Sequence, residues 1–227
     1  MSLPAAAAER RNICNGKGMT MTNQKYEITG IAHESYPFLH RIRALRDIGW
    51  KIKAGDMGGF VECEANLSFE PGDNAWIFDD AIACVSSHVD KGSRLFGNAV
   101  VCGNAYISHG STLSDQVRAE DDAYIRGADL SGQVRASGSS TILDSPDTGK
   151  APVLSETCVV YGTVMGDIHI TGDVVVLDGE KIINQTPDTL VMNGQGRSMI
   201  RDPLRDDLHP RQPAAQKKRT RKKEMER

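Results

Sequence analysis

Three histidines in the central part of this 227-residue chain, His88, His109 and His169, are its clearest candidates for acid–base chemistry. An imidazole exchanges a proton near neutral pH, so each of the three is able in principle to act as a general base. A base works only when the fold presents it to a substrate. The elements that carry these side chains therefore decide which of them is useful.

His88 and His109 lie in a six-residue repeat that runs from Gly72 to Ile142, and His169 lies where the repeat resumes, at Met165 to Ile170. In all twelve repeats the fourth position is small and the sixth is apolar. Two inward positions separated by one residue have the period of a strand. The other positions are rich in Gly, Asn and Asp, which favour tight turns. Each repeat therefore predicts one very short strand followed by one corner.

Such a unit cannot bury its own apolar side chain and must stack on copies of itself. Three corners close a triangle, so one coil takes eighteen residues. At that spacing the sixth positions sort by size into three ladders: Ile77, Leu95, Leu113 and Leu130; Ala83, Val101, Ala119 and Ala136; Val89, Ile107, Ile125 and Ile142. The same register predicts Phe78 over Phe96 and Cys84 over Cys102, with one tightened corner at Arg126 to Leu130.

These hexads resemble the hexapeptide-repeat superfamily, whose fold is the left-handed parallel β-helix. More closely, Arg43-Ala-Leu-Arg-Asp, Lys53-Ala-Gly-Asp-Met-Gly-Gly-Phe-Val-Glu, Asn66-Leu-Ser and the Val-x-Gly-Asn-Ala repeats resemble YdcK-like acyltransferases of bacteria and prophages. The resemblance covers roughly Tyr26 to Ile182. It implies an all-β, single-stranded left-handed parallel β-helix of about five triangular coils.

The resemblance also implies a function. Superfamily acyltransferases bind a coenzyme A thioester in the groove between neighbouring subunits of a trimer, and a histidine acts as general base on the acceptor hydroxyl or amine. We therefore expect a homotrimer that uses acetyl-CoA or another acyl-CoA. His109 is the candidate catalytic base because it falls in a corner, whereas His88 and His169 occupy outward strand positions. A zinc-dependent variant of the fold needs a closely spaced histidine pair, which the coils lack, so no metal is expected.

A non-catalytic structural or binding module, possibly prophage-derived, is the alternative. In Val101-Cys102-Gly103 the glycine stands one place later than in the superfamily's enzymes, and the long insertion after Ile142 contains no histidine. Outward positions at eighteen-residue spacing place His88, Tyr106 and Tyr124 on one face, where they form a candidate platform for a sugar or a neighbouring chain. Ordinary cross-strand stacking explains the same pattern. A second outward strip, Ile82 and Val100, is a candidate trimer contact.

The pattern divides the chain into five parts. We expect a disordered N-terminal extension over 1–25, a β-rich cap over 26–70, the β-helix over 71–182 with an inserted loop at 143–157, a C-terminal cap over 183–200, and a basic disordered tail over 201–227. That tail carries ten Lys or Arg against five Asp or Glu, although the whole chain has a formal charge of −3. Its dense run, Lys217 to Lys223, fits an acidic or nucleic-acid partner.

Cysteine usage and hydropathy indicate the cellular setting. The five cysteines are odd in number and form no CxxC pair, which favours thiols in a reducing cytoplasm over a disulfide framework. No apolar run approaches the length of a membrane-spanning helix. We therefore expect a cytoplasmic protein without a membrane partner.

Overall fold

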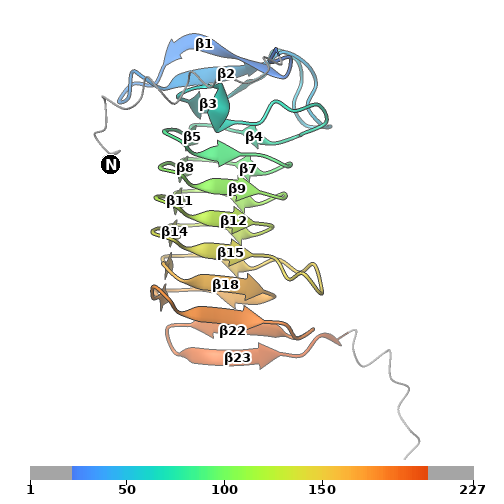
Figure 1. Cartoon of the computed structure of the whole chain (residues 1–227), viewed down its shortest axis with the longest axis vertical. Coiled ribbons are helices and arrows are strands. Elements are labelled where there is room, and N and C mark those ends of the chain that lie inside the picture. Colours follow the sequence, from blue (N-terminus) through green and yellow to red (C-terminus); the bar gives the residue numbers. More distant parts are fainter. Residues whose placement is uncertain (1–21, 204–227) are drawn as a thin grey trace, which may run out of the picture.

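The computed structural model describes residues 22–203, which form a β-solenoid of about seven turns (Figure 1). One short 3-10 helix, η1 (Glu64–Asn66), is the only helix that lies wholly within these residues. All strands of the solenoid body pair in parallel with the strands one turn before and one turn after. The predicted all-β fold of stacked parallel coils is therefore confirmed.

Three sheets form the sides of the solenoid, here called sheets I, II and III. Sheet I contains β1 (Tyr26–Ala32), β2 (His40–Ala44), β3 (Met57–Val61), β5 (Ile82–Ala83), β8 (Val100–Val101), β11 (Arg118–Ala119), β14 (Arg135–Ala136), β17 (Val159–Val160) and β20 (Val175–Val176). Sheet II contains β4 (Trp76–Ile77), β7 (Arg94–Leu95), β10 (Thr112–Leu113), β13 (Asp129–Leu130), β16 (Val153–Leu154), β19 (Ile168–Ile170), β22 (Thr189–Asn193) and β23 (Gly196–Ile200). Sheet III contains β6 (His88–Val89), β9 (Tyr106–Ser108), β12 (Tyr124–Arg126), β15 (Thr141–Leu143), β18 (Thr163–Gly166) and β21 (Lys181–Asn184).

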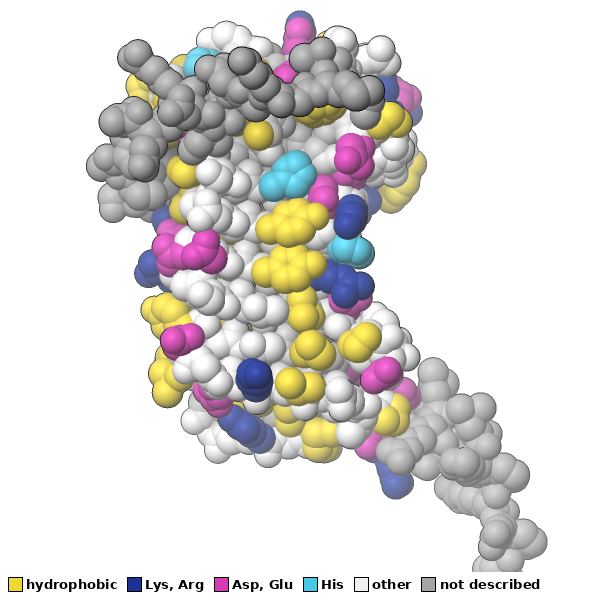
Figure 2. Space-filling view, viewed as in Figure 1, with side chains coloured by type: hydrophobic (Ala, Val, Ile, Leu, Met, Phe, Trp, Pro, Cys, Tyr) yellow, Lys and Arg dark blue, Asp and Glu magenta, His cyan; other side chains and the backbone are white. Residues whose placement is uncertain are grey.

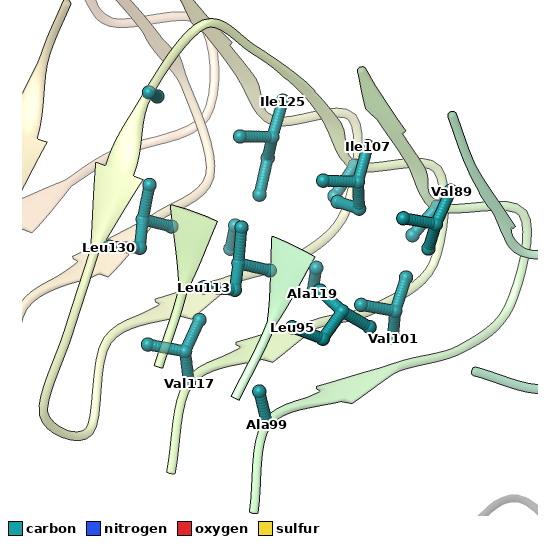
Figure 3. Packing of buried hydrophobic residues seen from close by; sticks show 14 of the residues in the cluster. Val89, Leu95, Ala99, Val101, Ile107, Leu113, Val117, Ala119, Ile125 and Leu130 are labelled. Carbon is teal, nitrogen blue, oxygen red and sulfur yellow. The ribbon is translucent and has the colours of Figure 1, made fainter. Parts of the chain in front are cut away.

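The core is the set of inward side chains that the eighteen-residue spacing predicted (Figure 3). Ile107 pairs with Val89 on one side and with Ile125 on the other, and all three are fully buried. The Leu95 and Val101 ladders have the same in-register arrangement. Phe78 also stacks on Phe96, with ring centroids 4.5 Å apart. Size-matched side chains thus fill each corner at every turn.

The corners depend on glycine and aspartate. Gly103 has a φ of 72°, and a Cβ atom there would come within 2.8 Å of the backbone of Asp121 in the next turn. Asp121 itself has a φ of 58°, and its carboxylate accepts a hydrogen bond of 2.9 Å from the N–H of Gly138, one turn further on. A left-handed corner residue in each turn is thus bonded to the corner of the next.

The solenoid is longer than the five coils expected from the repeat. Its first turn contains β3, whose Val61 pairs with Ala83, and Leu67, which bridges to Val89. Within the expected loop 143–157, Val153 and Leu154 form β16, so the connection shortens to 144–152. The expected C-terminal cap contributes β22, which continues sheet II in parallel before β23 returns antiparallel to it.

The N-terminal cap covers one outward face of the solenoid. Strand β1 pairs antiparallel with β2, and β2 pairs antiparallel with β3. The segment between β1 and β2 lays Leu39 and Phe38 against Ile82 and Val100, each of which is only 5% exposed. The expectation that the Ile82 and Val100 strip makes a trimer contact is therefore wrong, because the chain's own cap already covers it.

The predicted N-terminal extension ends earlier than residue 25. Lys25 is buried, and its Nζ donates a hydrogen bond of 2.7 Å to the carbonyl of Ser68. Next to it, the Tyr26 hydroxyl donates to the carbonyl of Leu67 at 2.8 Å. These two side chains tie the start of the described chain to the first turn.

The two ends of the chain lie partly beyond the structure. Residues 1–21 of the predicted extension fall outside the described residues. So do residues 204–227 of the basic tail, including the run Lys217 to Lys223. Over residues 22–203 no helix is long and apolar enough to cross a membrane.

The inward ladders predict a large effect of one substitution. Ile107→Asp places a charge without a partner between Val89 and Ile125, and we expect it to lower the free energy of unfolding by more than about 4 kcal/mol. Thr163→Asp on β18 is the matched control, because Thr163 is half-buried and pairs with the exposed Lys181. Urea denaturation followed by circular dichroism measures both. An Ile107→Asp variant as stable as Thr163→Asp would contradict the assigned core.

Candidate functional site

His88, Tyr106 and Tyr124 lie in register on the outer face of sheet III and form the aromatic ladder. The ring centroids of His88 and Tyr106 are 5.8 Å apart, and those of Tyr106 and Tyr124 are 5.5 Å apart with nearly parallel planes. In Figure 2 a histidine and large hydrophobic side chains follow one another along the axis of this face. The predicted stacking of these three residues is therefore present.

The first member of the ladder is held in place by one of its ring nitrogens. His88 Nδ1 lies 2.6 Å from the carbonyl oxygen of Ala65, which accepts hydrogen bonds only. Nδ1 therefore carries a proton and donates it to this carbonyl. The other nitrogen, Nε2, lies 4.0 Å from Oδ2 of Asp90. The backbone of the first turn therefore fixes the orientation of this imidazole, while the Asp90 carboxylate lies nearby, beyond hydrogen-bond distance.

Asp90 is a polar member of the site that the sequence reasoning missed. The Tyr106 hydroxyl donates a hydrogen bond of 2.6 Å to its Oδ2, while Oδ1 is buried and accepts no hydrogen bond from any described residue. Burial, together with this bond to the carboxylate, raises the pKa of Tyr106. The only sequence signal was position, since Asp90 stands two residues after His88 and points to the same side of the strand.

His109 lies on the same edge of the solenoid as the ladder. It follows β9 directly, is exposed, and occupies a corner with a φ of 58°. Its Nδ1 lies 2.7 Å from the hydroxyl oxygen of Ser108, and no described residue contacts its Nε2 through a hydrogen bond or ion pair. The next residue, Gly110, donates its N–H to the carbonyl of Lys91 in the previous turn. The predicted base thus occupies the corner that follows the strand of Tyr106, next to the ladder along the chain.

The third histidine lies elsewhere. His169 belongs to β19 in sheet II, between Val153 and Val191. Its Nε2 lies 3.8 Å from a carboxylate oxygen of the buried Asp167. Across residues 22–203, no group of three or more His, Cys, Asp or Glu side chains is placed to hold a metal ion. The candidate site thus contains two of the three histidines, one on the face of sheet III and one in the adjoining corner.

Three cysteines of the solenoid, Cys84, Cys102 and Cys158, lie outside the candidate site. Cys84 and Cys102 stand one turn apart, as predicted, directly after β5 and β8, and are packed with Leu39 and Phe60 under the cap. A hydrogen bond with Cys84 lowers the pKa of the Cys102 thiol. Burial raises the pKa of Cys158 to about 12, which makes its thiolate scarce at neutral pH. Packing accounts for these three buried residues.

Comparison of the sequence with protein-family models and with characterised proteins finds no significant match. The candidate site must therefore be interpreted from its own geometry.

The bond between Tyr106 and Asp90 can be tested against a matched variant. Tyr106→Phe removes the one hydrogen bond that the described structure gives to the Asp90 carboxylate, and we expect it to cost about 1–3 kcal/mol of stability. Tyr124→Phe is the control, because its hydroxyl makes no hydrogen bond to a described residue while its ring stacks in the same way. An equal loss of stability for the two variants in urea denaturation would show that the hydrogen bond from Tyr106 to Asp90 does not stabilise the protein.

Proposed function

We propose that the protein is a CoA-dependent acyltransferase of the hexapeptide-repeat class, with left-handed coils, that works as a homotrimer. It transfers an acyl group from a CoA thioester to a hydroxyl or amine acceptor. The observation that carries this proposal is the position of His109, an exposed corner imidazole with Nδ1 against the Ser108 hydroxyl and Nε2 directed away from any described polar partner. His88 is less suited as a base because both of its nitrogens face protein groups.

The chemistry requires one tautomer of His109. When Nδ1–H donates to the Ser108 oxygen, Nε2 carries the lone pair and accepts the proton of the acceptor hydroxyl or amine. The acceptor oxygen or nitrogen then bonds to the thioester carbonyl carbon, and the carbon–sulfur bond breaks. The departing CoA thiolate takes the proton from Nε2, so the imidazole returns to its neutral state and all atoms balance.

A neighbouring subunit would supply the second wall of the substrate groove, because His109 stands on a convex edge of one chain. Exposed apolar side chains on the far half of sheet I provide a contact surface for such a neighbour in place of the covered Ile82 strip. Val175 is 50% exposed and Leu177 is 63% exposed, and both follow β17 by one turn. The buried centre of a contact between identical subunits is more apolar than the rest of the surface, which these side chains fit.

A non-catalytic binding module is the second candidate, favoured by the aromatic ladder. The parallel rings of Tyr106 and Tyr124 and the adjacent His88 make a continuous aromatic row, and the half-buried Asp90 carboxylate accepts a hydrogen bond from Tyr106. Rows of this kind bind sugars or a neighbouring protein chain through stacking and hydrogen bonds at their polar tips. Under this alternative the ladder is the functional surface and His109 has no catalytic role.

Calorimetric titration with acetyl-CoA and free CoA, together with sedimentation analysis of mass, tests the first proposal. We expect a trimer that binds acetyl-CoA with micromolar affinity. Because His109 contacts the acceptor, His109→Ala should keep this affinity but release CoA at least about a hundredfold more slowly when an amine or hydroxyl acceptor is added, the scale of a lost general base. His169→Ala is the control, since that residue lies in sheet II. Absence of binding at millimolar acetyl-CoA would reject the acyltransferase and leave the binding module.

A further inference from the structure

A cavity of about 420 Å³ lies where the start of the described chain meets the first turn of the solenoid. Two cationic side chains, Lys25 and Arg46, line it together with Thr22, Gln24, Phe69 and Pro71. Its volume falls in the range of pockets that hold small molecules. A cavity with two cations and no acidic residue in its wall has the composition of an anion site.

The ammonium group of Lys25 has more donors than the protein satisfies. The side chain is 1% exposed, and among the described residues its Nζ donates only to the carbonyl of Ser68. An ammonium has three N–H donors, and a buried charge with unmatched donors is costly. Burial lowers the pKa of Lys25 to about 8, and the nearby charge of Arg46 acts in the same direction. The site would therefore gain stability from an anion.

The second cation has no carboxylate partner in the described chain. Arg46 makes only a long contact of 3.4 Å with the carbonyl of Asp47. The nearby acid, Asp73, is occupied, because its carboxylate accepts three backbone hydrogen bonds of 2.8 Å from Ala75, Lys91 and Gly92. Asp73 therefore offsets part of the positive charge at a distance, but it accepts no hydrogen bond from Lys25 or Arg46.

We propose that this cavity binds a small organic phosphate, with Arg46 holding the phosphate group and the buried Lys25 supplying a second positive charge in the cavity wall. Two neighbouring cations suit a dianion better than a single carboxylate, and a guanidinium matches the geometry of phosphate oxygens. The cavity exceeds the size of one phosphate, and Phe69 and Pro71 provide an apolar wall for the organic part. Thr22 and Gln24 add polar groups at the rim. This site is separate from acyl transfer and does not depend on it.

Titration of the full-length protein with glycerol 3-phosphate, followed by NMR of the backbone amides, tests the proposal. We expect saturable shifts at the lining residues, with inorganic phosphate competing for the same site and acetate failing to do so. Arg46→Gln should weaken binding about tenfold or more because it removes a charge-assisted hydrogen bond to the phosphate, and Lys25→Met should weaken it because it removes the second positive charge. Lys181→Gln, an exposed position on β21, should leave the affinity unchanged.

Three results would overturn it. The first is no saturable shift at millimolar glycerol 3-phosphate. The second is binding that the Arg46→Gln variant retains in full, provided that its melting temperature equals that of the wild type. The third is acetate competing as well as phosphate, which would reduce the cavity to a nonspecific anion site. Because acetyl-CoA takes no part in this titration, its outcome is independent of whether acyl transfer occurs.

Discussion

Axial stacking of inward side chains is the constraint on which the rest of the molecule depends. A six-residue unit has one apolar side chain and one small residue facing the axis, and neither is buried unless a turn lies above and below it. Val89, Ile107 and Ile125 show the result, with each held between equivalents in register. Each turn also bonds to the next through its backbone, as Tyr106 does to Ala123. The burial of apolar side chains and the backbone hydrogen bonds therefore both hold neighbouring turns together along the axis of the solenoid.

That constraint leaves the outward positions free to differ. On sheet I, Ile82 and Val100 accept the cap, while further along the same face Arg118 and Arg135 both pair with Glu120. On sheet III the outward positions carry aromatic rings, and the corner that follows carries His109. The cap adds a cavity with two cations at the first turn. The candidate functional groups thus lie on the outside of the solenoid, and the inward side chains contribute only to its stability.

The sequence predicted the ladders well because inward size and corner glycine repeat at a fixed spacing. It underestimated the number of turns in part because Pro152 was interpreted as part of a loop. Pro152 in fact occupies the fourth position of a repeat whose sixth position is Leu154. At that position the N–H bonds within its own corner, as Ala99 does to Phe96, so a proline breaks no ladder bond. The covering of Ile82 by the cap and the role of Asp90 were not predictable in this way. Both depend on single contacts between side chains that do not recur at a fixed spacing in the sequence.

Native-state amide hydrogen exchange tests axial stacking most directly. Amides in the middle of the solenoid, such as that of Tyr106, bond to one turn and lie beneath another, so they should exchange only through global unfolding. Amides of β20 and β21 lie at the edge of their sheets and should exchange faster. A gradient of protection from the middle turns to this edge is the predicted result. Fast exchange throughout the middle turns would contradict the account.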